Sequence, residues 1–502
     1  MSINLNWWML LLLMSGLSQK GQTQENSHPI HSSIFRQHYD RIANDLVDKY
    51  GKEATPMWLS SWNLDTQTYP FDFSRPDSIP CRVYLNRFID APAGATLYWS
   101  LPDISACIDL SSRIGRGNYR LSAKKYVEAY LERCTNKDGI ILWGNHYYYH
   151  VLMDTAVKFG SSDHPRAFDL ARESGHLHEM RPILPPWEVL HAWFPKRIER
   201  HITEVVQRHV VDTTGEFNRH ANGLSEYAFI EAGSILVHAL SFLYSKTEER
   251  RWLALADKII NYSVSHRNPD TGLVPNSPSK DRWDKYASTT EIGLWASNII
   301  KSTAYVPPEV KDRWIEIASQ ALRPWLKYGY DKEIRQYFGG LSVEDAKPIP
   351  KEDDYPYKPD KYTDIWHPLF PRHDYPMQFA ECCLDMFELT ADRIFEKAVH
   401  RWFATIQSQW NERHNRIQYA ENNGRIIHFL RRYASLYKVA EAKELADELT
   451  HETIKHLFVP NRGMLRSHTG EYRYDCVDGI GLLYLGIFEN KWSVEQRRNA
   501  YF

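Results

Sequence analysis

The chain has 502 residues, of which 43% are hydrophobic and 25% charged, and its 61 Lys plus Arg against 63 Asp plus Glu give a formal charge of -2. This balance gives no electrostatic reason to expect nucleic acid as a partner. The hydrophobic content is too high for a disordered chain, and no apolar run is long enough to span a bilayer. We therefore expect a globular protein without stable membrane insertion.

The N-terminus has the pattern of a secretory signal peptide. Residues 7–13 (WWMLLLL) form a short apolar run, and small and polar residues follow over 15–23. The segment before the run contains no Lys or Arg, so its only positive charge is the α-amino group. We predict a signal peptide over residues 1–23, a single domain over residues 24–502, and a secreted or periplasmic protein.

The chain has 6 cysteines and none of them lies in a C-x-x-C pair, which argues against a zinc ribbon or a thioredoxin-like site. After export, Cys81 would be able to pair with Cys107 or Cys134. The favoured interpretation is that the cysteines are isolated buried thiols.

From about residue 30 onward, apolar residues recur at i, i+3, i+4 and i+7 between clusters of Gly, Pro, Asn or Asp, which is the pattern of helices. The clearest of them span residues 224–244, 250–266, 289–304, 308–328, 376–389, 393–410, 426–437, 440–458 and 477–488. The best candidate pair of strands is 82–85 with 96–99. A long loop rich in Pro, Asp, Tyr and Lys covers 345–374, and a loop of this length is usually functional.

A succession of helical hairpins with almost no sheet fits either an open solenoid or a closed α/α toroid. No motif recurs at a fixed period, as a solenoid requires. The loops richest in chemistry lie between helices, and in a toroid such loops converge on one rim. We therefore predict an all-α fold, an (α/α) toroid or barrel of helical hairpins with minor β structure near the N-terminal part.

His, Glu, Arg and Trp are concentrated between residues 143 and 223, in the runs 143–146 (WGNH), 176–181 (HLHEMR), 187–191 (WEVLH) and 217–220 (FNRH). Imidazole and carboxylate without thiolate are suitable ligands for Mn, Fe or Zn. The runs contain no H-E-x-x-H motif, and any one of these histidines alone is more typical of a surface or a hydrogen-bonded core position. Their clustering makes a site and such structural positions equal alternatives.

The runs 178–181 (HEMR), 186–188 (PWE) and especially 217–220 (FNRH) resemble family 2 of the polysaccharide lyases. The resemblance extends through 143–146 and the downstream helices, over about residues 100–490. It implies a pectate lyase-like enzyme with an (α/α)7 barrel rather than (α/α)6. Residues 160–175 have the character of an insertion, and the loop 345–374 has no counterpart in the family pattern.

The resemblance also implies a catalytic site. Family members hold a transition metal, typically manganese, with two His and one Glu, and their catalytic base is an Arg directly before one metal-binding His. This pattern places the base on Arg219 and metal ligands on His220, Glu179 and His146, with Glu188 as the competing carboxylate. Manganese is expected before calcium or zinc.

The implied reaction is β-elimination on an acidic polysaccharide or oligosaccharide: a base removes the proton on C5 of a uronate, and the bond from C4 to the glycosidic oxygen breaks. A divalent metal on the substrate carboxylate would stabilise the developing charge. Arg219 is an unusual base, because the pKa of a guanidinium lies above about 12. The alternative role for Arg219 is pairing with a substrate carboxylate.

Cations and aromatic rings that stand together in loops or at helix starts are suited to binding uronates. The alternative interpretation is a solvated, partly aromatic surface. The residues expected to bind substrate are Arg181, Arg282, Lys285, Tyr286, Arg372 and His373.

The chain lacks a G-x-S-x-G elbow, a P-loop and a strand-embedded G-x-G-x-x-G, which argues against serine hydrolases, nucleotide hydrolases and dinucleotide-dependent enzymes. Two alternatives to a lyase stay open. One is an α/α-barrel glycoside hydrolase with paired carboxylates, such as Glu226 with Glu231 or Asp284, or a sugar epimerase with His pairs. The other is an inactive carbohydrate-binding relative.

Overall fold

The structure is a computed structural model of the 502-residue chain. It describes residues 28–69, 94–144, 147–159, 168–170, 178–180, 182–225, 227–278, 286–349, 360–367, 375–489 and 501–502. The predicted signal peptide lies outside these residues.

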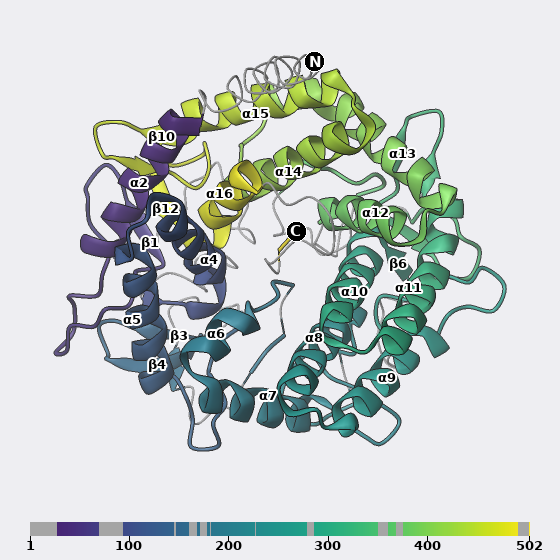
Figure 1. Cartoon of the computed structure of the whole chain (residues 1–502), viewed down its shortest axis with the longest axis horizontal. Coiled ribbons are helices and arrows are strands. Elements are labelled where there is room, and N and C mark those ends of the chain that lie inside the picture. Colours follow the sequence, from purple (N-terminus) through teal and green to yellow (C-terminus); the bar gives the residue numbers. More distant parts are fainter. Residues whose placement is uncertain are drawn as a thin grey trace, which may run out of the picture.

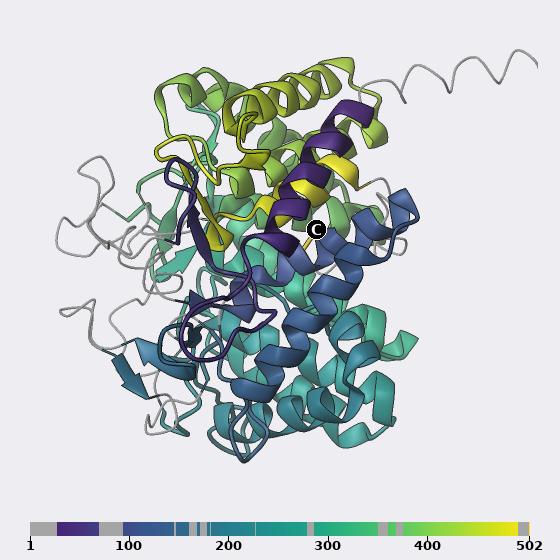
Figure 2. The same cartoon turned by 90° about the vertical axis from the view of Figure 1, so that its left-hand side faces the viewer.

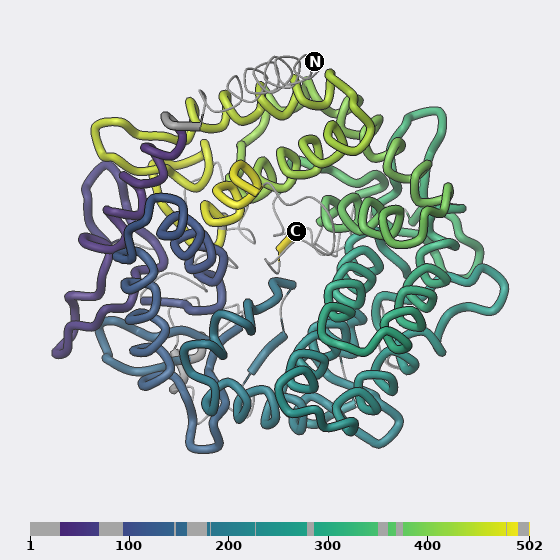
Figure 3. Tube along the Cα trace, in the orientation of Figure 1, coloured from purple at the N-terminus to yellow at the C-terminus, as the bar shows by residue number. Residues whose placement is uncertain are grey.

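The helices form two concentric layers around a common axis, and the chain follows the ring once from its N-terminal to its C-terminal part (Figures 1 and 3). The inner layer consists of α4 (Leu97–Ile114), α6 (Trp187–Trp193), α8 (Ile230–Thr247), α10 (Thr289–Ser302), α12 (Pro376–Thr390), α14 (Ala420–Tyr437) and α16 (Ile480–Phe488). The outer layer consists of α2 (His28–Asn44), α5 (Asn118–Arg133), α7 (Pro195–His209), α9 (Arg250–Ser265), α11 (Pro308–Tyr328), α13 (Arg393–Gln409) and α15 (Ala440–Leu457).

The ring is closed by the packing of α16 against α4. The two backbones approach so closely that a Cβ atom at Gly481 would lie 2.3 Å from the carbonyl carbon of Pro102. The predicted toroid is therefore confirmed and the open solenoid is excluded. The number of repeats, expected to be seven, stays a prediction. The inner helix α6 is short, and residues 171–177 and 181, which precede it, lie outside the described part.

Burial separates the two layers. In α8 every residue from Ile230 to Leu243 is buried, as expected of a helix that is surrounded by others. The outer helix α7 instead buries one stripe, which includes Ile198, Ile202 and Val205. Apolar character all round thus places a helix inside the ring, and an amphipathic pattern places it outside.

The connections at the two ends of the ring differ in length. From inner to outer helices, α8–α9, α12–α13 and α14–α15 are joined by two residues, the first of which is left-handed (Glu248, Ala391 and Lys438). From outer to inner helices the connections are long, such as 134–186 and 329–375, and the strands lie in them. Figure 2 shows the strands gathered at one end of the ring. This arrangement agrees with the prediction that the loops rich in His, Glu, Arg and Trp converge on one rim.

The largest sheet, of antiparallel strands in the order β2-β3-β4-β5, belongs to the N-terminal part: β2 (Gly94–Ala95), β3 (Tyr147–His150), β4 (Thr155–Phe159) and β5 (Phe168–Leu170). Two-stranded pairs occur further along. They are β1 (Ser61–Asn63) with β12 (Arg473–Asp475), β6 (Tyr286–Ser288) with β9 (Gly340–Ser342), β7 (Tyr330–Asp331) with β8 (Gln336–Tyr337), and β10 (Phe458–Val459) with β11 (Met464–Leu465).

Tyr501 and Phe502 lie on the axis of the ring (Figure 1). Both are buried, at 4% and 2% exposure. Arg425 of α14 donates from Nη1 to the Tyr501 carbonyl oxygen at 3.1 Å, and the Phe502 ring stacks on His428 at 4.2 Å between centroids. This segment therefore fills space between the inner helices.

Most predicted helices are confirmed to within a few residues, and α9 and α11 begin where expected. The helix predicted over 224–244 begins only at Ile230, because Tyr227 has a φ of 44° and Phe229 has a non-helical ψ of 128°. The strand predicted over 96–99 is wrong: Thr96 is the N-cap of α4 and Leu97 starts the helix. Its partner 82–85 lies outside the described residues.

Cys107, Cys134, Cys382, Cys383 and Cys476 are buried free thiols, in agreement with the favoured interpretation, and Cys81 lies outside the described residues. Of the predicted loop 345–374, the structure describes residues 345–349 and 360–367. Among the helices that the structure describes, none combines the length and apolar character needed to cross a membrane.

Candidate active site

Two short segments from different connections pair at the rim of the ring. Glu179 and His220 form an antiparallel bridge. The Met180 N–H donates to the Arg219 carbonyl at 2.9 Å, and the Ala221 N–H donates to the His178 carbonyl at 3.0 Å. Backbone pairing thus brings the 178–180 run against the 219–221 run.

The Glu179 carboxylate is the centre of this pairing. Its Oε1 lies 3.4 Å from Arg219 Nε and 3.5 Å from His220 Nε2. The Glu179 side chain is 2% exposed, whereas those of Arg219 and His220 are 19% and 18% exposed. A buried carboxylate therefore stands behind a cation and an imidazole that both reach solvent.

Gly144 explains how the 143–146 run approaches this centre. Its φ is 115°, which disfavours a side chain, and a Cβ atom there would lie 2.7 Å from the Glu179 carbonyl oxygen. The backbone just before Asn145 and His146 consequently lies against Glu179. His146 itself lies outside the described residues.

Arg219 is held by aromatic rings as well as by Glu179. Its guanidinium carbon lies 5.0 Å from the Phe229 ring centroid and 6.0 Å from that of Tyr227, and the His220 ring packs edge-on against Tyr227 at 5.2 Å. The Arg219 N–H also donates to the Tyr227 carbonyl at 3.1 Å. The left-handed Tyr227 delays the start of α8, and this extended stretch supplies the rings.

Beneath the pair lies a buried group of aromatic and histidine rings. The Trp143 indole N–H donates to His178 Nε2, His178 Nδ1 and His209 Nε2 are 2.9 Å apart, and His209 Nδ1 lies 2.7 Å from the Asn218 carbonyl oxygen. His201 accepts from the Ile141 N–H at 3.1 Å. All three histidines are at most 3% exposed.

Burial keeps these imidazoles neutral. It lowers the pKa of His201 to about 3 and that of His209 to about 4, and it lowers the pKa of His178 well below its usual value. Both ring nitrogens of His178 and of His209 already have partners, and Nδ1 of His201 accepts from a backbone N–H, which favours a supporting role for these rings over metal ligation.

Asn218 fixes the turn that carries Arg219 and His220. Its Oδ1 accepts from the His220 N–H at 2.9 Å, and its Nδ2 donates to Asn222 Oδ1 at 2.8 Å and to the Leu224 carbonyl at 2.9 Å. Asn218 is fully buried. The FNRH run therefore contributes a structural residue, Asn218, beside the two candidate functional residues Arg219 and His220.

The structure thus brings together three of the predicted residues, Glu179, Arg219 and His220. Glu188, the competing carboxylate, stands on α6 with its side chain 54% exposed and lies 3.0 Å from Lys246 Nζ. Tyr286 is buried in β6, at 8% exposure. The other predicted residues lie outside the described part: His146, Arg181, Arg282, Lys285, Arg372 and His373, and of the hydrolase alternative Glu226 and Asp284.

Sequence reasoning missed His201 and His209. Both lie on the buried stripe of α7, together with Ile198, Ile202 and Val205. The sequence did contain a signal, because both histidines lie on the apolar face of an amphipathic helix. This pattern shows that the rings are buried, but not which other rings they contact.

The described residues contain no group of three or more His, Cys, Asp or Glu side chains placed to hold a metal ion. Glu179 and His220 nevertheless supply a carboxylate oxygen and an imidazole nitrogen 3.5 Å apart. Ligands at about 2.0–2.2 Å from one metal ion are separated by roughly this distance or less, so this donor pair fits a divalent transition metal.

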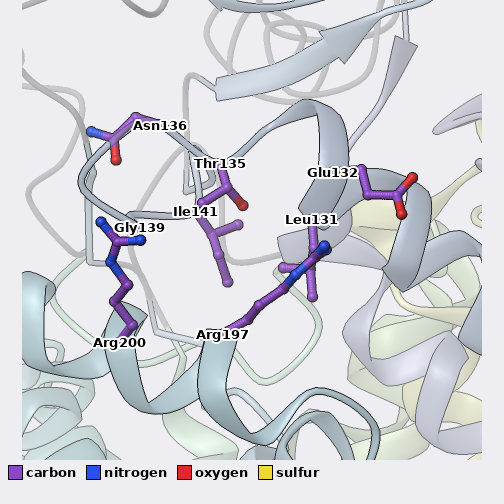
Figure 4. A pocket seen from close by; sticks show the side chains of 8 residues that line it. All are labelled: Leu131, Glu132, Thr135, Asn136, Gly139, Ile141, Arg197 and Arg200. Carbon is purple, nitrogen blue, oxygen red and sulfur yellow. The ribbon is translucent and has the colours of Figure 1, made fainter.

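A surface pocket of ≈ 310 Å³ lies elsewhere, between the end of α5 and α7 (Figure 4). None of the predicted site residues lines it. Its lining is Leu131, Glu132, Thr135, Asn136, Gly139, Ile141, Arg197 and Arg200.

Residues 106–228 match the family model of the periplasmic pectate lyases, which confirms the resemblance to polysaccharide lyase family 2. The matched segment contains Glu179, Arg219 and His220 as well as the supporting histidines. A search of curated proteins gave no match to this chain.

Solved structures with a related shape include an α-1,6-mannanase, GH76A, from Salegentibacter sp. HEL1_6, which is 9% identical over 91% of this chain and 98% of that chain, with a TM-score of 0.43. A D-mannose isomerase is 11% identical over 78% of this chain and 86% of that chain, with a TM-score of 0.47. A cellobiose 2-epimerase from Bacillus thermoamylovorans B4167 is 7% identical over 91% and 99%, with a TM-score of 0.45. We draw no functional conclusion from similarity at this level.

Proposed function

We propose that this protein is a metal-dependent polysaccharide lyase that cleaves a uronic-acid-containing, pectate-like polysaccharide by β-elimination. The observation that carries the proposal is the meeting of Glu179, Arg219 and His220 at one carboxylate oxygen, within 3.5 Å. The match of residues 106–228 to a pectate lyase family supports it, because that segment supplies all three groups.

In this proposal Glu179 and His220 hold a divalent transition metal, with manganese expected, and His146 is the predicted third ligand. A bound metal supplies a Lewis acid for the substrate carboxylate. Gly144 and the Asn218 turn keep the two described ligands in place, since one lies against Glu179 and the other bonds to the His220 N–H.

Arg219 lies beside the same carboxylate, and in this proposal it acts on the substrate directly. Its guanidinium is oriented by Phe229 and by Glu179, and its side chain is 19% exposed. As the base it would take the C5 proton of the uronate in its neutral guanidine form; the C5–H electrons would form the C4–C5 double bond, and the glycosidic oxygen would leave from C4 and take up a proton from solvent. As a partner of the uronate carboxylate it would instead orient the substrate, with two parallel N–H···O bonds.

The position of the ligands on the rim suits a polymer, because the outer-to-inner connections leave the chemistry at one end of the ring (Figure 2). We also propose that the protein is exported, since the predicted signal peptide is consistent with a family described as periplasmic.

The experiment is to incubate the purified protein with a panel of uronate polysaccharides and to identify the new chain ends. Unsaturated uronides, absorbing in the ultraviolet and requiring manganese, support the lyase. Saturated reducing ends that form in the presence of chelator would contradict it and support a glycoside hydrolase. Glycan binding without either product would support an inactive carbohydrate-binding protein.

A further inference from the structure

The strongest unassigned feature is the buried chain of hydrogen bonds that runs from Trp143 through His178 and His209 to Asn218. It connects the two segments that carry the candidate ligands: His178 precedes Glu179, and Asn218 lies two residues before His220.

The two ends of this series of hydrogen bonds, at Trp143 and at Asn218, set its direction. An indole N–H only donates, so His178 Nε2 accepts and the proton of the neutral ring is on Nδ1. His178 Nδ1–H then donates to His209 Nε2, which leaves the proton of His209 on Nδ1. A carbonyl oxygen only accepts, and His209 Nδ1–H donates to that of Asn218. The two ends thus require the same pair of tautomers.

His209 also binds Asn218 through its backbone, since the Asn218 N–H donates to the His209 carbonyl at 2.8 Å. The last residue of α7 is therefore clamped to the start of the Asn218–His220 turn by two bonds, one from the ring and one from the backbone. The ring's other nitrogen reaches His178 at 2.9 Å. Rotation of the His209 ring is excluded unless both ring bonds break.

We propose that His209 is a positioning residue: through a directional relay of Nδ1–H tautomers at His178 and His209, it sets the register of the Glu179 segment against the His220 segment. The relay itself does not depend on the proposed function, whereas its effect on metal binding rests on it. Residues that orient metal ligands in this manner typically change metal affinity by about 10–100-fold when removed.

The first test is nitrogen NMR of the wild-type protein at neutral pH. Both His178 and His209 are expected as neutral Nδ1–H tautomers. An Nε2–H tautomer or a charged ring at either position overturns the relay. This readout needs neither metal nor substrate, and a purely packing role for the two rings would not require it.

The second test is hydrogen exchange of the Met180 and Ala221 amides, whose bonds hold the two segments together. In His209→Leu both relay bonds are lost, and the protection of these amides is expected to fall by about 10-fold or more, the value of a buried hydrogen bond. His209→Asn keeps a donor near the Nδ1 position for the Asn218 carbonyl, so it should restore part of the protection.

His38→Gln is the matched control. His38 is also fully buried on an outer helix, and its Nδ1 accepts from the Leu465 N–H at 3.2 Å, but it lies outside the relay. It should leave the two amides unchanged. Equal loss in His38→Gln, or wild-type protection in His209→Leu, overturns the proposal; if His209→Leu does not fold, His209→Asn and the tautomers decide.

Titration with manganese in the absence of substrate separates the two proposals. Weaker binding by about 10–100-fold in His209→Leu, and not in His38→Gln, supports positioning of metal ligands. If the wild-type protein binds no manganese while the tautomers and the protected amides are as expected, the relay stands and the proposed lyase fails.

Discussion

Replacing Glu179 by Gln is expected to weaken manganese binding strongly and to abolish lyase activity while the fold persists. Gln has nearly the volume of Glu and keeps a carbonyl oxygen, so the packing of this side chain, which is 2% exposed, changes little. What disappears is the negative charge that faces Arg219 and His220 at 3.4 and 3.5 Å.

The magnitude follows from these separations. A unit charge pair at 3.4 Å attracts by about 5 kcal/mol at an effective dielectric constant of about 20. Desolvation of the carboxylate and the partial exposure of Arg219 offset most of this, so we expect a net loss of stability of about 1–3 kcal/mol. For the metal, loss of an anionic ligand should lower the affinity by about 100-fold or more, which corresponds to about 2.8 kcal/mol.

The assay is manganese titration together with the ultraviolet rate, and Glu188→Gln is the control. Glu188 is the competing carboxylate of the sequence pattern, but its pair with Lys246 is exposed and contributes about 0.5 kcal/mol or less. The account is refuted if Glu179→Gln keeps manganese affinity and turnover within about threefold, a difference of less than 1 kcal/mol, or if Glu188→Gln loses as much.

Three further predictions concern other parts of the ring. Arg219→Lys should lower kcat with little change in KM if Arg219 is the base, and should mainly raise KM if it pairs with the substrate carboxylate; steady-state kinetics distinguish the two roles. Phe502→Ala removes a buried ring that stacks on His428 and should cost about 3 kcal/mol in urea unfolding, whereas Tyr472→Ala, at an exposed ring, should change stability by about 0.5 kcal/mol or less. Burial lowers the pKa of His238 to about 3; since an unfolded His titrates near 6.5, its contribution to stability is present above pH 6.5 and is lost as the pH falls toward 3. His238→Gln should therefore flatten the loss of unfolding free energy between pH 7 and 5 by about 2 kcal/mol, and an unchanged slope would contradict the assignment.

The fold was accessible from the sequence because helix periodicity is a local property. The predicted helices over 250–266 and 308–328 correspond to α9 and α11, since apolar spacing and Pro308 define them without reference to the rest of the chain. Closure of the ring was not accessible in this way, because it depends on the contact of Gly481 with Pro102, between positions far apart in the sequence.

The errors have a common cause. The residues from 224 to 229 are apolar enough for a helix, but Tyr227 takes a left-handed backbone so that its carbonyl meets the Arg219 N–H. Leu97–Trp99 have the composition of a strand, yet they begin a buried inner helix, where apolar residues on all sides are the rule. In both places tertiary contacts override the local pattern.

For the site, short motifs indicated which residues carry chemistry, and the structure adds how they meet. Glu179 and His220 are joined by a backbone bridge that no spacing rule predicts. His209 lies on a helix whose pattern shows only that it is buried. Its role appears when its partners, His178 and the Asn218 carbonyl, are known.

The most direct test of the central claim is the rate of ultraviolet absorbance when the wild-type protein acts on polygalacturonate with manganese, with chelator, and with manganese restored. We predict a rate that chelator abolishes and manganese recovers, and that is lost in Arg219→Ala. A rate that chelator leaves unchanged, or that persists in Arg219→Ala, would contradict the assignment of Glu179, Arg219 and His220 as a metal-dependent lyase site.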